Sequence, residues 1–329
     1  MREQAFHTIV DRRCLGSVRF PWLLFHGKPM QQPNAIPTVR IALEWYLNPD
    51  HLPLIYAQEQ ARAEGGLSIE LVVPDDHYDG FEALAREEVQ VVVNEPLHLL
   101  EKHAGSVALQ ALGTFFHTDG GVLITHDAQA TLKSGGSIRV ASPVSNPVTD
   151  GLCRDILVGW YKKQGVNVAP EQISVYEAGF DHVANLSNGA DAAWLAFANI
   201  EGVHAQHLGL PVVMCSTSDG GVPGFSALEL IADRNAKPAV KNALEKLVGY
   251  VNQAVPALLA DPQAALNLWY RISDTEPSAL TEAMVNDTLS RFVAPVSPDA
   301  SRWRPIWEYM RAHKADVVDA STFEAIFQP

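Results

Sequence analysis

The sequence is poor in cysteine and in basic residues, and each shortage argues against a class of protein. Three cysteines, Cys14, Cys153 and Cys215, stand far apart in 329 residues, without the CxxC spacing of zinc sites or the dense pattern of disulfide-rich domains. We therefore predict no metal centre. The 24 lysines and arginines face 38 aspartates and glutamates, so the net charge is −14. Because such a surface repels phosphate groups, we expect neither nucleic acid nor an anionic membrane face as a partner.

Long apolar runs are also missing. No segment approaches the roughly 18 to 20 apolar residues of a membrane span, so we expect no membrane-spanning segment. Arg12 and Arg13 precede the apolar residues 20–25 in a way that loosely resembles a twin-arginine export signal, but charged residues interrupt the run. We predict an N-terminal arm over residues 1–37. The compartment stays open: periplasmic if the arm is a degenerate leader, and cytoplasmic otherwise.

Segments typical of strands and of helices alternate from residue 38 onward, in two series. The first series has predicted strands at 39–43, 67–73 and 89–93, with helices beginning near 48 and 79. The second has predicted strands at 122–125, 137–141, 173–176, 191–196 and 211–214, with helices at 148–164 and 182–188. This alternation is typical of parallel sheets covered by helices.

Two α/β units followed by about a hundred mostly helical residues predict a bilobal clamp. We expect lobe 1 to comprise residues 38–123 plus 228–329, and lobe 2 to comprise residues 124–227. In open α/β sheets, ligands bind outside the carboxyl ends of the strands. The candidate site residues are therefore those that follow the predicted strands.

The segment after the first predicted strand carries two aromatic and two polar candidates. Trp45 and Tyr46 are suited to hold a flat ring between them, while Asn48 and His51 offer polar contacts to ring nitrogens or amino groups. The alternative is that both rings are core wedges. Asn48 precedes a proline and an aspartate, the pattern of a helix N-cap, so ligand binding would be an additional role.

Other candidates follow the remaining predicted strands. They are His98, Ser145, Glu177, Asn199, Glu201 and Asp219. Ser145 precedes a helix whose free N–H groups suit an anion, and the carboxylates suit a ligand amine. The glycine-rich turn 219–224 lacks a phosphate-binding pattern and is predicted to be a hinge or a cleft-lining turn. Each of these residues has an alternative role as a cap or as a solvated loop residue.

The stretch ALEWYLNPDHLPLIYAQE at 42–59 resembles the opening of the thiamine-pyrimidine synthase-like family. Weaker similarities are at 189–192, 199–202, 219–223 and 303–310. The family includes fungal enzymes that build the thiamine pyrimidine and bacterial ABC-importer proteins that bind pyrimidine precursors. The resemblance implies the type II periplasmic-binding-protein fold, from about residue 39 to the C-terminus.

The resemblance also separates two functional classes. In the fungal synthases a histidine is consumed with pyridoxal phosphate in an iron-dependent reaction that needs a cysteine-rich segment. His98 matches that histidine, but Asn94 stands where the lysine that holds pyridoxal phosphate would be, and residues 221–225 lack the cysteines. Without these groups neither a Schiff base nor soft iron ligation is expected.

We therefore predict a binding protein without catalytic residues or cofactor. Its expected ligand is a small planar heterocycle such as a thiamine pyrimidine precursor, and its expected partner is an ABC permease. The alternatives are a synthase-like enzyme using His98, pyridoxal phosphate and iron, or a cytosolic ligand sensor. A monomer or a weak dimer is expected.

Overall fold

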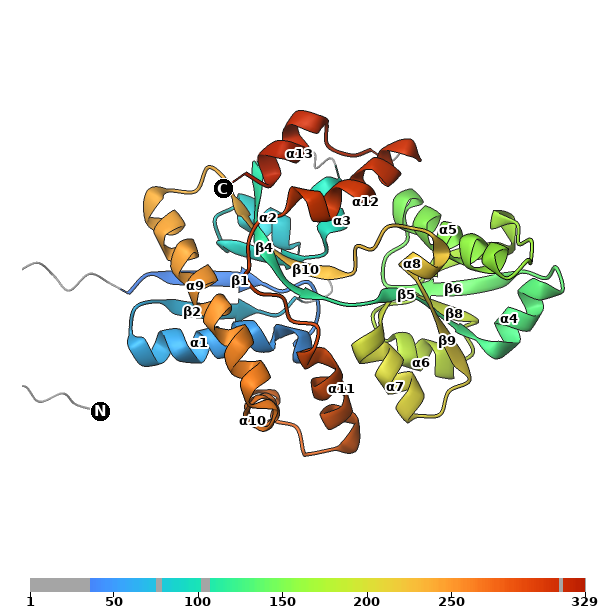
Figure 1. The fold of residues 1–329 in the computed structure, drawn as a ribbon, viewed down its shortest axis with the longest axis horizontal. Helices are drawn as coiled ribbons and strands as arrows, with labels where there is room; N and C mark the ends of the chain where they lie inside the picture. The colour runs from blue at the N-terminus through green and yellow to red at the C-terminus, as the bar shows by residue number, and fades with distance from the viewer. Residues whose placement is uncertain (1–35, 75–78, 102–106, 314–315, 329) are drawn as a thin grey trace, which may run out of the picture. The chain divides into compact units, whose positions relative to one another are not determined.

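Two five-stranded sheets organise the chain (Figure 1). The computed structural model describes residues 36–74, 79–101, 107–313 and 316–328. The leader-like segment and all but the last two residues of the expected N-terminal arm lie outside the described residues. Each of the two sheets was predicted from the alternation of strands and helices, and both are confirmed.

The first sheet contains the strands on either side of a long excursion of the chain. In spatial order it consists of β2 (Ser68–Val72), β1 (Thr38–Ala42), β3 (Val91–Asn94), β10 (Ala227–Asp233) and β4 (Leu109–His117). β1 is parallel to β2 and β3, whereas β10 is antiparallel to both β3 and β4. A strand end was expected at His117, but no bounds were predicted for β4.

The second sheet repeats the same plan. Its spatial order is β7 (Ile173–Glu177), β6 (Ile138–Ser142), β8 (Ala192–Phe197), β5 (Gly120–Thr125) and β9 (Val212–Ser216). β6 is parallel to β7 and β8, and β5 is antiparallel to β8 and β9. The parallel pairing expected for the first series is confirmed for β1, β2 and β3, whereas β10 and β5 add antiparallel pairs to the two sheets. In each sheet, the single reversed strand is the one that the chain enters directly from the other sheet.

Helices cover both sheets. Those associated with the first sheet are α1 (Leu52–Glu64), α2 (Gly80–Ala85), α3 (Pro96–Leu100), α9 (Pro238–Ala260), α10 (Pro262–Ser273), α11 (Ala279–Leu289), α12 (Ala300–Ala312) and α13 (Ala320–Ile326). The others are α4 (His126–Lys133), α5 (Pro147–Lys163), α6 (His182–Ser187), α7 (Val203–His207) and α8 (Thr217–Gly220), with short turns η1 (Pro49–His51), η2 (Pro170–Gln172) and η3 (Ala198–Gly202). No helix among the described residues is long and apolar enough to cross a membrane.

The N-cap predicted at Asn48 is confirmed, and a glycine ends the helix that follows it. The Asn48 side chain accepts a hydrogen bond from the Asp50 N–H at the start of η1, which leads directly into α1. Gly65 ends α1 with φ +70°, a backbone conformation that only glycine adopts without cost. Because α1 begins immediately after the β1 loop, the cap fixes the residues that follow β1 in place.

The chain crosses between the sheets twice, and these crossings lie together. β5 begins at Gly120, so residues 120–123 belong to the second sheet and not to the first, as the expected boundary at 123 had them. The return occurs just before β10, within one residue of the expected boundary. The Thr118 N–H donates to the Ser226 carbonyl over 2.9 Å, so the outgoing and returning segments are hydrogen-bonded to each other.

Candidate functional site

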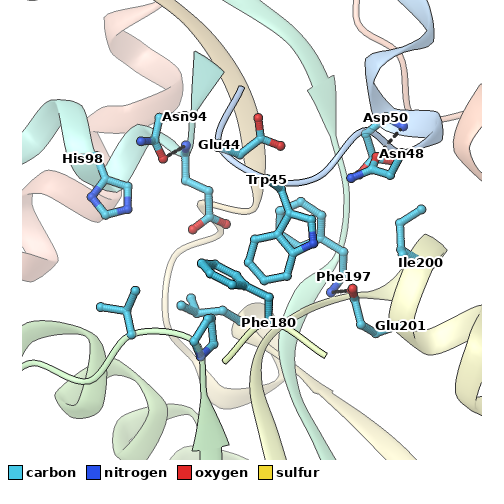
Figure 2. Close-up of a pocket in the computed structure, with 14 residues that line it drawn as sticks. Glu44, Trp45, Asn48, Asp50, Asn94, His98, Phe180, Phe197, Ile200 and Glu201 are labelled. Atoms are coloured by element: carbon cyan, nitrogen blue, oxygen red, sulfur yellow. Dashed lines mark hydrogen bonds between the residues drawn. The ribbon is translucent and has the colours of Figure 1, made fainter. Parts of the chain in front are cut away.

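A cavity of about 240 Å³ lies where loops from the ends of strands in both sheets meet (Figure 2). An apolar cavity of about 150 Å³ is known to hold benzene, so this space accommodates a substituted six-membered ring. Its described lining consists of Glu44, Trp45, Asn48, Asp50, Asn94, Glu95, His98, Pro143, Val144, Phe180, Leu195, Phe197, Ile200 and Glu201. The location agrees with the rule that ligands bind outside the carboxyl ends of strands.

Trp45 provides an aromatic wall of the cavity, but Tyr46 does not. The ring of Trp45 meets Phe180 edge-on, with 4.4 Å between the ring centroids (Figure 2). It also stacks on His182, with 5.5 Å between centroids. Tyr46 is 49% exposed and borders a neighbouring cavity. The expected Trp45–Tyr46 sandwich is therefore not formed, because consecutive residues of this loop point to different spaces. Phe180, which was not among the predicted site residues, forms a second aromatic wall of the cavity, in direct edge-on contact with Trp45.

His51 orients a carboxylate that lines the cavity, and does not itself line it. Its fully buried ring places Nε2 3.1 Å from Glu44 Oε1, while Nδ1 accepts a hydrogen bond from the Asn48 N–H. Burial lowers the pKa of His51, but Glu44, Asp50 and the backbone of Asn48 together raise it more, so the net pKa lies above the ordinary value. The predicted direct contact of His51 with the ligand is replaced by this supporting role, since the turn buries the ring.

Asn199 is likewise a structural residue in this structure. Its amide nitrogen donates to Asp50 Oδ1 over 2.6 Å and to Thr288 Oγ1 over 2.8 Å, and its oxygen accepts from Thr118 Oγ1 over 2.9 Å. It is fully buried and does not line the cavity. Burial raises the pKa of Asp50 to about 7. We call Asp50, Asn199, Thr118 and Thr288 the clasp, because they join loops of both sheets to α11.

The loop after β3 supplies two titratable groups. His98 lines the cavity, as predicted, and its Nδ1 lies 3.1 Å from Glu101 Oε2. Glu95, which the sequence analysis did not select, occupies the N-cap position of α3 without making a capping hydrogen bond. Burial raises the pKa of Glu95 to about 7. Its position directly after a predicted strand was the signal that identified His98 and applies equally to Glu95.

Glu201 lines the cavity from the side of the second sheet. Its Oε2 accepts a hydrogen bond from the Phe197 N–H over 2.8 Å, which holds the carboxylate at the end of β8 (Figure 2). Asn48 also lines the cavity while capping η1. The structure therefore brings Trp45, Asn48, His98 and Glu201 together out of the ten predicted residues.

Three predicted residues lie elsewhere. Ser145 donates its hydroxyl to Asp150 within the loop that starts α5, and Glu177 is exposed at the end of β7. Asp219 accepts from Ser216 Oγ over 2.7 Å in α8. The predicted cleft-lining role of the 219–224 turn is not met among the described residues, because α8 packs against α5 and none of this turn borders the cavity.

The cavity is acidic. Four carboxyl groups border it, and neither lysine nor arginine does so among the described residues. These residues also contain no group of three histidine, cysteine or acidic side chains arranged to hold a metal ion. Such a lining favours a ligand with N–H donors or positive charge and disfavours phosphate and sulfonate groups.

Known protein families include one whose sequence pattern matches this chain. The sequence pattern described as "NMT1/THI5 like" matches residues 48–265, which include most strands of both sheets and most of the residues that line the cavity. The chain belongs to the NMT1/THI5-like family. The resemblance seen in residues 42–59 is thereby confirmed.

Two relatives extend over nearly the whole NMT1/THI5-like chain. A Haemophilus influenzae protein, whose name provisionally assigns it to thiamine biosynthesis, is 25% identical over 284 residues, which are 83% of this chain and 86% of the relative. The formylaminopyrimidine-binding protein of Halalkalibacterium halodurans is 24% identical over 314 residues, 89% of this chain and 91% of the relative.

Solved structures show the same fold. A ligand-binding component of an ABC-type import system from Staphylococcus aureus has a TM-score of 0.65 at 11% identity, covering 88% of this chain and 98% of that one. The alkanesulfonate-binding protein of Xanthomonas axonopodis pv. citri has a TM-score of 0.62 at 17% identity, with coverage of 87% and 97%. The fold is thus the bilobal periplasmic-binding-protein clamp. Most of the relatives and structures with a named function are binding proteins and not enzymes.

Proposed function

We propose that this NMT1/THI5-like protein is the solute-binding component of an ABC importer and that its ligand is a small planar nitrogen heterocycle of the pyrimidine type. The observation that carries the proposal is the ring-sized cavity whose aromatic walls, Trp45 and Phe180, come from loops of different sheets. Family membership and the name of the formylaminopyrimidine-binding relative support the ligand class.

A ligand in the cavity contacts loops that belong to both sheets. A ligand that touches Trp45 after β1 and Phe180 after β7 stabilises the arrangement in which these loops are close, by its higher affinity for that state. A permease that recognises this arrangement receives only the loaded protein. In this role the protein works on the outer side of the cytoplasmic membrane, which is the periplasmic alternative for its location.

The charge of the cavity lining predicts a different class of ligand from that of an anion-binding protein with the same fold. The alkanesulfonate-binding neighbour takes an anion, whereas the four carboxyl groups of this cavity repel one. We expect a phosphorylated pyrimidine to bind at least tenfold more weakly than its alcohol, since no cation among the described lining residues compensates the added charge.

Calorimetric titration with 4-amino-5-hydroxymethyl-2-methylpyrimidine tests the proposal. Trp45→Ala removes a wall of the cavity and is expected to weaken binding at least tenfold, whereas Trp45→Phe retains part of the affinity. Tyr46→Ala is the matched control, because this neighbouring aromatic residue borders a different cavity and is expected to leave affinity within about twofold. Failure of the wild-type protein to bind, or unchanged binding by Trp45→Ala, contradicts the proposal.

The synthase-like alternative does not fit the residues present. Asn94 lines the cavity where the resemblance places a lysine, and an amide nitrogen forms no Schiff base. The cysteines of the described residues, Cys153 and Cys215, are buried, and burial raises the pKa of Cys215 to about 12, so it offers no thiolate to iron. We expect the mass of the His98-containing peptide to stay unchanged after incubation with pyridoxal phosphate and iron.

A further inference from the structure

Glu95 differs from the other carboxyl groups of the cavity, because no side chain or backbone group among the described residues donates a hydrogen bond to its carboxyl oxygens. Oε1 is covered by protein atoms, yet no described residue donates a hydrogen bond to it, and none donates to Oε2. The backbone of Glu95 is engaged: its N–H donates to the side-chain oxygen of Asn94 over 2.9 Å, and its carbonyl oxygen accepts from the His98 N–H over 3.1 Å. A buried carboxyl group without a donor costs free energy, so its retention requires a reason outside the folded chain itself.

The other three carboxyl groups each have a protein partner. Glu44 is paired with His51, Asp50 accepts from Asn199, and Glu201 accepts from the Phe197 N–H. These contacts fix their positions and use part of their capacity to accept hydrogen bonds. Glu95 therefore has the largest unused capacity among the carboxyl groups that border the cavity.

Glu95 also does not cap its own helix, α3. It stands at the N-cap position of α3, where a side-chain oxygen that accepts from the first N–H groups stabilises a helix, but it makes no such bond. Since the carboxyl group borders the cavity, it is available to a ligand and not to its own helix.

We propose that Glu95 selects the ligand by pairing edge-on with a ring nitrogen and the amino group next to it. This inference rests on the proposed function and names the chemical class that the site takes, an amino-substituted nitrogen heterocycle. The two oxygens of a carboxyl group match the spacing of two adjacent nitrogens, so two parallel hydrogen bonds form. Rotation about the terminal torsion of Glu95 is soft, so Oε1, which protein atoms cover in this structure, turns toward the ring together with Oε2 when the ligand enters.

The two parallel hydrogen bonds require one proton, which lies on either the Glu95 carboxyl group or the ring nitrogen. A protonated Glu95 donates to the ring nitrogen and accepts from the amino group, and a protonated ring facing the ionised carboxylate gives the same pair with the proton moved. Above pH 7 the free carboxyl group is ionised and the free ring is neutral, so binding takes up a proton. Affinity then falls by up to about tenfold per pH unit.

Two variants separate recognition from structure. Glu95→Gln retains one donor and one acceptor without a titrating proton, whereas Glu95→Leu removes both. The probes are 4-amino-2,5-dimethylpyrimidine and 2,5-dimethylpyrimidine, which lacks the amino group. Glu177→Gln is the matched control, because this exposed glutamate does not line the cavity.

In the wild-type protein we expect the amino compound to bind about 30-fold or more tightly than the compound without it, since a site built for a polar edge rejects the analogue that lacks it. Glu95→Leu is expected to bind both alike and to have a higher melting temperature, because it removes an unsatisfied carboxyl group. Glu95→Gln is expected to keep the preference for the amino compound and to lose proton uptake, measured by titration at pH 8 in buffers of different ionisation enthalpy.

The remaining titratable groups of the cavity, Glu44, Asp50, His98 and Glu201, are unchanged in Glu95→Gln, so the difference from wild type isolates Glu95. If the wild-type protein binds the amino compound but Glu95→Leu keeps the preference, the inference is wrong and the proposed function stands. Equal proton uptake by wild type and Glu95→Gln also contradicts the inference, even where Glu95→Leu does not fold. If the wild type binds neither compound, the proposed function fails together with the inference.

Discussion

The amide nitrogen of Asn199 lies 2.6 Å from the buried carboxylate of Asp50 and joins the loop after β1 to the turn after β8. Both residues are almost completely shielded from solvent, and every polar atom of the Asn199 side chain is used. The clasp therefore connects the two sheets directly beside the cavity. Its integrity and the shape of the cavity depend on the same four side chains.

Asn199→Ala is expected to lower the free energy of unfolding by about 3 kcal/mol, because it leaves Asp50 buried without its main donor and frees Thr118. Urea unfolding measures the loss. Asn188→Ala is the control, since Asn188 is exposed at the end of α6 and is expected to change stability by less than about 0.5 kcal/mol. Equal effects of the two substitutions contradict a stabilising role of the clasp.

Two glycines of α5 provide a matched pair. A Cβ atom on Gly159 would lie 1.8 Å from the carbonyl oxygen of Gly220 in α8, whereas a Cβ on Gly151 meets nothing within 4 Å. Gly159→Ala is therefore expected to destabilise the protein by about 3 kcal/mol or more, through overpacking against backbone. Gly151→Ala is expected to stabilise it by about 0.5 to 1 kcal/mol, because alanine favours the helix.

Thermal unfolding of these two variants measures the contrast. A stable Gly159→Ala protein would show that α5 and α8 do not approach as closely as in this structure. The comparison is internally controlled, since both substitutions add one methyl group to the same helix.

Phe180 is expected to contribute to binding and little to folding. Its ring meets Trp45 edge-on but is 46% exposed, so Phe180→Ala removes little buried area. We expect the affinity for 4-amino-5-hydroxymethyl-2-methylpyrimidine to fall about tenfold, with a change in unfolding free energy below about 1 kcal/mol. Leu208→Ala, at another exposed apolar residue, serves as the control. Wild-type affinity in Phe180→Ala contradicts an aromatic wall at this position.

Stability is expected to fall as the pH rises from 5 to 8. Burial raises the pKa of Asp50, Glu95 and Glu229 to about 7, so the native state keeps protons that the unfolded chain loses near pH 4. The pKa of His51 and His98 is also raised, because neighbouring carboxylates outweigh burial, and their contribution is lost as the pH passes their folded-state values. All five groups act in the same direction.

Urea unfolding at pH 5, 6, 7 and 8 measures this dependence. Glu229→Gln is expected to reduce the decline, since it removes one titrating group remote from the cavity lining while it keeps an acceptor for the Thr114 hydroxyl. Greater stability at pH 8 than at pH 5 contradicts the assignment.

The order of strands and helices was predictable because its signals are local. The Asn48 cap, the end of α1 at Gly65 and the apolar core of β3 depend on neighbouring residues alone. The direction of β5 and β10 was not predictable from periodicity, because an antiparallel strand entered by a crossover has the same pattern as a parallel one. Gly113, with φ +138°, also lies within β4, which obscured that strand.

The site was only partly predictable, for a related reason. A position after a strand indicates Trp45, His98 and Glu201, but whether a side chain faces the cavity or its own loop depends on contacts between distant segments. Asn199 lies after a strand as expected, yet it meets Asp50 from the other sheet and turns inward. Phe180 follows a predicted strand as His98 does, but nothing local distinguished it from the other residues of its loop, because its partner Trp45 is more than a hundred residues away in the chain.

The hydrogen bond between Thr118 and Ser226 has a consequence for engineering. It means that the second lobe is an insertion within the sequence of the first, and that the two ends of the insertion lie side by side. Because its ends are adjacent, the whole inserted segment can be exchanged for that of a relative without moving the strands that flank it. One apolar cluster contains residues of both lobes, so such an exchange requires matching faces.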